Sequence, residues 1–512
     1  MQAGNDRESE NRIDYDKLMF RRQFLLTSRN CSSLDHWQHG SLNHYRLYVH
    51  RDLELNIVEG ENQRTKAALI GYMIDPLRPD RSNGEIINDI IRTTETVESL
   101  SKYLYSISGR FVLIVTTADD TYVFHDPCGL RSVYYSQYEG GIVLGSQPLI
   151  FRHVMPLKAK NRFYSYEKST YKKSNKEHWL PSGSSLFENI HHLIPNHYLQ
   201  VSSCKQVRYW PNEKLDPRQL GEAANEASAL LKKLIVAGHK RFDLAFPLTA
   251  GLDSRVLLSA SKPVADDTYF YTLQYRTLQL ESNDIEIPVK LLQTLGLNHH
   301  LIDCRISTDK EFDQFYDRNA SMAHKDDWGS IAYGMYGIYP QGRVCIKGNC
   351  AEIARCFYFK KGKHLPITSA QQLVELESGW DTLPFIGAQL DDWYLEASTA
   401  AEKTGLDILD LFYWEHRMGS WQAQSQLEWD IIQEAYTPFN HRQLLEIMLG
   451  VSAKYRCAPN YILFRKMIET LWPECLSQPI NPARTVKDKL KRILSDLGLI
   501  DITRRIYRAI GQ

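Results

Sequence analysis

The first two hundred residues alternate between short apolar runs and turn residues, a pattern typical of β-strands. Runs at 109–117, 121–126 and 141–146 are rich in Val, Ile, Phe and Tyr, and Gly, Asp, Asn or Pro separates them. This spacing predicts short strands joined by tight turns. One helix, at about 84–105, is expected to interrupt them. The front of the chain is therefore predicted to be a β-rich domain.

The pattern changes after Tyr209-Trp210-Pro211. Residues 218–240 have Leu and Ala at helical spacing, and strands then alternate with helices, which predicts a parallel sheet covered by helices. From about 367 to the end, nearly all of the chain is predicted to be helical. A length of 512 residues favours two domains. We therefore predict an α+β protein with a boundary near 210–217 and domains 1–212 and 213–512.

Composition and charge argue against several classes of partner. Lys plus Arg (61) equals Asp plus Glu (61), so the net charge gives no reason to expect a nucleic acid. The longest apolar runs are far shorter than the roughly 20 residues of a membrane-spanning helix, and the polar N-terminus lacks a signal pattern. The nine cysteines are dispersed without a CxxC pair, which favours free thiols. These features predict a cytoplasmic protein with no membrane partner.

One segment carries the strongest chemical signal. A predicted buried strand ends at Leu248, the small residues Thr249, Ala250 and Gly251 follow, and a helix is expected to begin near Ser254. Small residues let backbone N–H groups approach a phosphate, and a helix N-terminus favours the negative charge. The hydroxyls of Thr249 and Ser254 can donate hydrogen bonds, and Asp253 can hold Mg²⁺. An ordinary strand–turn–helix with a capping serine would have the same pattern and stays an alternative.

The sequence TAGLDS at 249–254 resembles the SGGLDS pyrophosphate loop of the asparagine synthetase family. A strand at 268–275, residues 281–285, residues 295–300 and a strand beginning at 342 then follow in the family's order. The strand that begins at 342 leads into residues that occupy the place of the family's SGEGxDE segment. The resemblance implies a PP-loop α/β domain that uses ATP and Mg²⁺. It places these residues at the nucleotide: Leu248, Thr249, Ala250, Gly251, Asp253, Ser254, Leu273 and Gly348.

The same resemblance assigns the metal to Asp253 and Glu352, at the carboxyl ends of neighbouring strands. Glu352 as a simple helix-terminus carboxylate is the alternative. His299 and His300 are interpreted as surface or core residues, because no carboxylate or third histidine has a suitable spacing.

The front half resembles class II glutamine amidotransferases. Residues 109–115 and 125–135 are similar to the GRFAL and RDPFGIRPLYY stretches of those enzymes, and 185–199 to TLFEGI and LLPGHYL. The resemblance implies an antiparallel sandwich of the N-terminal-nucleophile (Ntn) type. That fold uses an N-terminal Cys whose own amine is the base. Here Gln2 follows Met1 and the first cysteine is Cys31, so we expect an inactive glutaminase domain. Trimming that exposes Cys31 is an alternative that no sequence signal supports.

The back half departs from the family at two catalytic positions. Asn349 stands where the family has a glutamate, and no lysine follows residues 471–476, where the family places one. Removal of such a charge contact commonly costs about 10²–10³ in rate, so a substitute is expected. Lys487 is the first choice, with Arg484 and Lys489 as others. The basic segment 484–508 is interpreted as a solvated helix face, and a rim that binds an anionic substrate is the alternative.

Residues 415–421 resemble the helical region that lies beside the acceptor pocket in the family. Arg417 and Trp421 are therefore expected either as substrate contacts or as scaffold residues.

The function that the resemblance implies is an AMP-forming amide ligase that adenylates a carboxylate and joins it to an amine. The acid would be a small molecule, a peptide or a sugar acid. The amine would come from the same molecule, from free ammonia or from a separate nitrogen donor. The alternative is a nucleotide-binding pseudo-synthetase, which Asn349 and the missing lysine favour and Asp253, Ser254 and Glu352 oppose.

Overall fold

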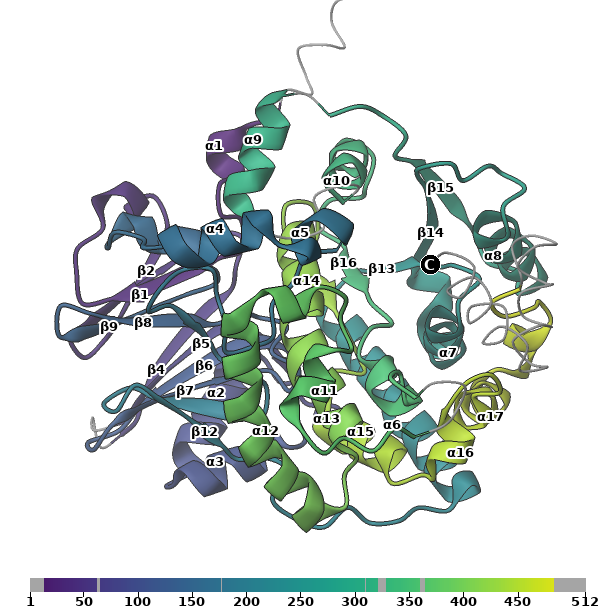
Figure 1. The fold of residues 1–512 in the computed structure, drawn as a ribbon. Helices are drawn as coiled ribbons and strands as arrows, with labels where there is room; N and C mark the ends of the chain where they lie inside the picture. Colours follow the sequence, from purple (N-terminus) through teal and green to yellow (C-terminus); the bar gives the residue numbers. More distant parts are fainter. Residues whose placement is uncertain are drawn as a thin grey trace, which may run out of the picture.

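The computed structural model describes residues 13–61, 65–175, 177–308, 310–320, 328–359 and 364–482 (Figure 1). Two antiparallel sheets occupy the front of the chain, and a parallel sheet with helices on its faces follows. The predicted α+β class, with a helical C-terminal region, is confirmed. Arg484 and Lys487, expected from sequence to be catalytic, lie outside the described residues, as does Lys489.

Two six-stranded antiparallel sheets pack face to face in the front half. The first has the order β10-β8-β9-β1-β3-β2 and the second β12-β11-β7-β6-β5-β4. Alternating residues point inward from both sheets, and Leu26, Leu47, Ile70 and Val112 share one buried cluster between them. The strands of the first sheet are β1 (Phe24–Thr27), β2 (Gln38–Leu42), β3 (Tyr45–Val49), β8 (Tyr134–Tyr138), β9 (Gly141–Gly145) and β10 (His191–His192). Those of the second are β4 (Leu55–Glu59), β5 (Lys66–Ile74), β6 (Ser108–Thr116), β7 (Thr121–His125), β11 (His197–Gln200) and β12 (Lys205–Arg208).

The helix expected at 84–105 is two helices, α2 (Asn83–Thr93) and α3 (Val97–Leu104). Thr94 and Thr96 have extended backbone, and the Thr96 side chain caps α3 by accepting from the Ser99 N–H. Both helices pack on the outer face of the second sheet. The front half also contains α1 (Tyr15–Leu18), α4 (Lys160–Lys168) and α5 (Thr170–Ser174).

The back half is built on a five-stranded parallel sheet of order β15-β14-β13-β16-β17. Its strands are β13 (Leu244–Pro247), β14 (Tyr269–Gln274), β15 (His300–Asp303), β16 (Val344–Ile346) and β17 (Ala435–Tyr436). The first four agree with the predicted alternation of strands and helices. β17 lies in the part of the chain predicted to be nearly all helix, where that prediction was incomplete.

Helices cover both faces of the parallel sheet. The long helix α6 (Leu220–Arg241) shares one apolar cluster with α7 (Leu252–Ala260), α8 (Asn283–Thr294) and α17 (Ile462–Leu471). The other face carries α9 (Lys310–Asn319), α10 (Trp328–Tyr336) and α14 (Ala423–Trp429). The remaining helices are α11 (Ala370–Val374), α12 (Pro384–Thr404), α13 (Ile408–Phe412), α15 (Arg442–Leu449) and α16 (Ala453–Arg456), with a π-helix at Tyr413–Gln422. No helix in the described ranges is long and apolar enough to cross a membrane.

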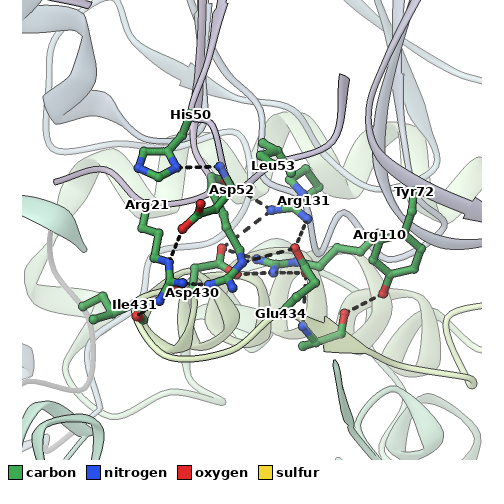
Figure 2. Close-up of polar contacts among 12 residues, drawn as sticks. Arg21, His50, Asp52, Leu53, Tyr72, Arg110, Arg131, Asp430, Ile431 and Glu434 are labelled. Carbon is green, nitrogen blue, oxygen red and sulfur yellow. Dashed lines mark hydrogen bonds and ion pairs between the residues drawn. The ribbon is translucent and has the colours of Figure 1, made fainter. Parts of the chain in front are cut away.

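A buried ionic cluster joins the two halves (Figure 2). Arg110 on β6 forms a bidentate ion pair with Asp430, with Nη1–Oδ1 and Nη2–Oδ2 distances of 2.5 and 2.8 Å. Arg131 Nη2 lies 2.8 Å from Glu434 Oε2. Burial raises the pKa of Glu434, but the guanidinium groups of Arg131 and Arg110 outweigh it and bring that pKa to about 2. Tyr72 Oη donates to the carbonyl oxygen of Ala435 on β17 at 2.6 Å. The front half therefore holds the edge strand of the parallel sheet. The boundary predicted near 210–217 falls between β12 and α6 and stays a prediction.

Candidate functional site

The order of the parallel strands points to one end of the sheet. β14 and β15 lie on one side of β13, and β16 and β17 on the other, so the chain reverses direction across the sheet between β13 and β16. The connections after these two strands leave in opposite directions and open a crevice at their carboxyl ends, where open α/β sheets bind ligands. The TAGLDS segment follows β13, and the segment 347–352 follows β16.

The loop after β13 is held by its own hydroxyl groups. Thr249 Oγ1 accepts from the Gly251 N–H at 3.1 Å and lies 3.3 Å from Ser254 Oγ. Ser254 Oγ donates to the carbonyl oxygens of Thr249 and Gly251, each 3.2 Å away. Gly251 is the N-cap of α7, which begins two residues before the expected start at Ser254. The exposed Thr249, the buried Ala250 and the first turn of α7 thus form a small-residue turn at a helix N-terminus, a geometry that can accommodate an anion.

Strand β14 supports this loop from the side. Thr272 Oγ1 donates to the Leu248 carbonyl oxygen at 2.8 Å, and His299 Nε2 lies 2.9 Å from the same hydroxyl. His300 stacks on Tyr269 with ring centroids 4.1 Å apart. Both histidines therefore contact sheet residues, in line with their interpretation as structural. Leu273, expected near the nucleotide, is partly exposed on β14.

Gly348 brings the two connections into contact. A Cβ added at Gly348 would lie 3.1 Å from the Cβ of Asp253, so a larger residue would push the segments apart. Asn349 follows in the same turn and is partly buried. Cys350 has a φ of +71°, and a short 3₁₀ turn (Ala351–Arg355) then presents Glu352. The structure therefore places Asp253, Gly348 and Glu352 at one site, as expected from the sequence.

Arg355 lies between the two acids, and sequence reasoning missed it. Its Nη1 is 2.9 Å from Asp253 Oδ1, and its Nη2 is 3.8 Å from Glu352 Oε1. Burial raises the pKa of Asp253 to about 7 although Arg355 opposes the shift, and the Glu352 charge adds to it. Within the described residues, Glu352 Oε2 and Arg355 Nε have no hydrogen-bond partner. The available signal was an arginine three residues after Glu352, but only the fold turns it toward Asp253.

These residues fit Mg²⁺ and a phosphate chain. Asp253 and Glu352 supply carboxylate oxygens, which are ligands that Mg²⁺ prefers, and among the described residues Asp253 Oδ1 and Glu352 Oε2 have no hydrogen-bond partner. Across the described ranges, no three His, Cys, Asp or Glu side chains are grouped to hold a metal. A metal held by these two acids would therefore complete its shell with water and phosphate oxygens, as Mg²⁺ usually does.

The C-terminal segment 475–481 packs against the loop that follows β13. Arg255, fully buried on α7, donates to the carbonyl oxygens of Cys475, Gln478 and Pro479 at 2.6, 2.9 and 3.3 Å. The Asn481 N–H then donates to the Ala250 carbonyl oxygen at 2.9 Å. The last described residues thus lie beside the loop, at the point where the chain continues toward Arg484 and Lys487.

Arg417, expected either as a substrate contact or as a scaffold residue, lies in an aromatic cage. Its guanidinium is 5.6, 5.2 and 4.7 Å from the ring centroids of Trp179, Phe357 and Trp421. It also pairs with Glu377 at 3.2 Å and with Glu177 at 3.7 Å. Glu177 and Trp179 belong to the front half, so both halves build this cage. Burial raises the pKa of Glu377, against the effect of Arg417.

A cavity of about 890 Å³ lies elsewhere, between α3, the linker 209–216 and the start of α15. Its exposed rim carries both signs of charge. Its buried Arg442 already donates to Asn196 and Tyr209. The crevice residues do not line this cavity, so its size gives no reason to move the candidate site from the end of the sheet.

Comparison with known proteins does not assign the chain. No family model matches it, and neither does any curated protein. One solved structure that aligns is a glutamine phosphoribosylpyrophosphate amidotransferase from B. subtilis, complexed with ADP and GMP. It is 10% identical, with 60% of this chain and 68% of that chain covered and a TM-score of 0.24. Another is described as an allosteric regulatory enzyme of purine biosynthesis, with 10% identity, coverage of 60% and 66%, and a TM-score of 0.25. At these TM-scores the similarity does not support an assignment of fold or function.

Proposed function

We propose that this protein is an ATP-dependent, AMP-forming amide ligase similar to asparagine synthetases. The main support is the position of Asp253 and Glu352 on either side of Arg355, with Gly348 packed against Asp253, at the switch point of the parallel sheet. A small-residue turn and the N-terminus of α7 lie beside these acids, and together they suit a nucleotide triphosphate with Mg²⁺.

The residues divide between binding and charge neutralisation. Backbone N–H groups of the loop and the hydroxyls of Thr249 and Ser254 would bind phosphate oxygens. Asp253 and Glu352 would hold Mg²⁺, which neutralises charge on the departing pyrophosphate. A carboxylate oxygen of the substrate attacks the α-phosphorus, the bond to the bridging oxygen of the β-phosphate breaks, and pyrophosphate leaves. The amine then displaces AMP from the mixed anhydride to give the amide.

The front half is proposed to be an Ntn-type domain without glutaminase activity. Its two antiparallel sheets with a buried core between them support this assignment. Cys31 is 2% exposed, and its backbone N–H is a peptide donor bonded to Tyr48 Oη at 2.8 Å. It therefore lacks the free amine that the glutaminase reaction needs. Nitrogen would come from an amine of the substrate, from ammonia or from a separate donor.

The acid that the enzyme activates is proposed to bind between the metal-binding acids and the Arg417 cage. Arg417 has the planar donor set that recognises carboxylates, and aromatic rings line the approach. A small-molecule, peptidyl or sugar carboxylate fits this description.

A second candidate is a nucleotide-binding scaffold without ligase activity. The position of Arg355 favours it, because the guanidinium lies between the two acids that would hold the metal. Asn349 also favours it, because it replaces a glutamate of the family. Asn481 lies beside the loop and does not carry the positive charge expected near the reaction centre.

Calorimetric titration with Mg·ATP tests the nucleotide site. Because Asp253 would hold the metal, Asp253→Ala should weaken binding at least tenfold, about 1.4 kcal/mol or more. Asp266→Ala, which removes an exposed carboxylate outside the crevice, is the matched control and should leave the affinity unchanged. Equal affinities of the wild type and Asp253→Ala would leave the segment as an ordinary turn.

A further inference from the structure

The proposed reaction needs positive charge at the crevice. Asp253 and Glu352 both lie there, one on each side of Arg355, and a triphosphate would add more negative charge at the same point. Phosphoryl-transfer sites meet this need with metal ions and with guanidinium or ammonium groups aimed at the leaving oxygens. The described chain end brings Asn481, not a cation, to the loop.

Arg355 is a cation already in contact with both acids. Its side chain is 16% exposed, and its guanidinium carbon lies 5.6 Å from the centroid of the Tyr461 ring. Two of its nitrogens face Asp253 and Glu352, and its Nε–H has no partner among the described residues. The guanidinium therefore has one buried N–H donor that no described residue uses, and it contacts the loop through Asp253.

The backbone around Arg355 is fixed at both ends. Cys350 has a φ of +71° and Cys356 a φ of +52°, so a left-handed residue bounds the 3₁₀ turn on each side. Neither residue is glycine, and such conformations persist where the surroundings enforce them and often at functional sites. Both cysteines are buried, which anchors the turn in the core. Glu352 and Arg355 are thus presented together toward Asp253.

We propose that Arg355 binds the pyrophosphate part of the nucleotide and stabilises its charge as it leaves. This inference rests on the proposed function. When the substrate oxygen bonds to the α-phosphorus, the electron pair of the broken P–O bond stays on the pyrophosphate. Arg355 counters that added charge with its planar donor set, which matches phosphate oxygens. Arg355 and a divalent cation also compete for the carboxylates of Asp253 and Glu352.

Because Arg355 would contact both the phosphate and the two acids, its removal should change the affinities for pyrophosphate and for a divalent cation in opposite directions. Removal of the guanidinium takes a donor from the phosphate and frees both carboxylates for metal. Arg355→Met should therefore weaken the binding of inorganic pyrophosphate in EDTA by roughly tenfold or more, as expected for loss of a charge-assisted contact. The same variant should bind Mn²⁺ alone more tightly than the wild type. Arg355→Lys, which keeps the charge without the planar fork, should bind pyrophosphate with intermediate affinity.

The matched control is Arg305→Met, because Arg305 is also an arginine in an ion pair, with Asp303 at 2.6 Å, but outside the crevice. It makes the same change in net charge and should leave both affinities as in the wild type. Phenylglyoxal modification of wild-type Arg355, followed by peptide mass, gives a measurement that needs no variant. Pyrophosphate should protect Arg355 from the reagent.

The outcomes separate the two proposals. If the wild type binds Mg·ATP and pyrophosphate but Arg355→Met and Arg355→Lys bind both as tightly, Arg355 is a structural ion-pair residue and the inference is wrong. Absence of protection against phenylglyoxal would have the same meaning. If the folded wild type binds neither ligand, the proposed nucleotide site itself is wrong.

Discussion

Asp253 is the residue on which the charge balance of the crevice depends. It lies in the first turn of α7, where the helix dipole favours an anion, yet burial and the nearby Glu352 raise its pKa to about 7. Arg355 at 2.9 Å offsets only part of that cost. A raised carboxyl pKa of this kind is expected at a cation-binding site when no metal ion is present to offset the negative charge of the acids.

The raised pKa of Asp253 predicts a pH-dependent cost in the metal-free protein. The folded state retains the proton up to about pH 7, whereas the unfolded chain loses it near pH 4. The penalty is therefore absent below about pH 4, grows with pH and is complete above pH 7, where it reaches at most about 4 kcal/mol. Asp253→Asn should thus stabilise the protein more at pH 8 than at pH 5, by about 2 kcal/mol.

Urea unfolding in EDTA at the two pH values measures this difference. Asp266→Asn, on an exposed carboxylate outside the crevice, should show none. An Asp253→Asn effect that is the same at pH 5 and pH 8 would mean that the Asp253 carboxyl does not titrate as proposed.

At the scale of elements, β17 links the front half to the crevice. It pairs with β16, whose end leads to Gly348, and the Lys347 N–H donates to the Tyr436 carbonyl oxygen at 2.8 Å. On the side of the front half, Tyr72 donates to Ala435, and Arg110 and Arg131 hold the turn before the strand through Asp430 and Glu434 (Figure 2). The front half therefore helps to position the segment that carries Glu352 and Arg355.

Removal of one member of this buried cluster should be costly. Arg110→Met leaves Asp430 and Glu434 buried with less compensation, so we expect a loss of about 3–5 kcal/mol in the free energy of unfolding. Addition of Asp430→Asn removes one of the uncompensated charges, and the double variant should lose less than the sum of the two single changes. Denaturant titration of the four proteins measures both values. A cost below about 1 kcal/mol for Arg110→Met would contradict a role for the cluster in joining the halves.

Prediction from sequence succeeded where local pattern decides the structure. The TAGLDS turn lies between a buried strand and a helix, and β14 and β16 follow in the expected order, because apolar runs and small-residue turns fix these elements locally. β17 was missed because it is two residues long within helical sequence and exists only through its pairing with β16. Arg355 was missed for a similar reason, since its contact with Asp253 joins residues 102 positions apart.

At the scale of the whole molecule, the two halves share one buried core. The largest apolar cluster contains Tyr72 and Cys128 from the front half and Trp414 and Tyr436 from the back half. Trp414 Nε1 donates to the Pro127 carbonyl oxygen at 2.8 Å, and Asn440 Nδ2 donates to Asp126 at 2.7 Å. A front half without a glutaminase nucleophile would thus still be required to build the crevice and the Arg417 cage.

Exchange of labelled pyrophosphate into ATP, together with the identity of the nucleotide product, is the decisive assay for ligase activity. The full chain would be incubated with Mg·ATP and a panel of amino, uronic and peptidyl acids, with Asp253→Ala and Glu352→Ala as inactive controls. An AMP-forming ligase should show acid-dependent exchange and formation of AMP, and both activities should be lost in the two variants while their folded state persists. Formation of ADP, or absence of exchange with every acid while Mg·ATP still binds, would contradict the ligase and favour the nucleotide-binding scaffold.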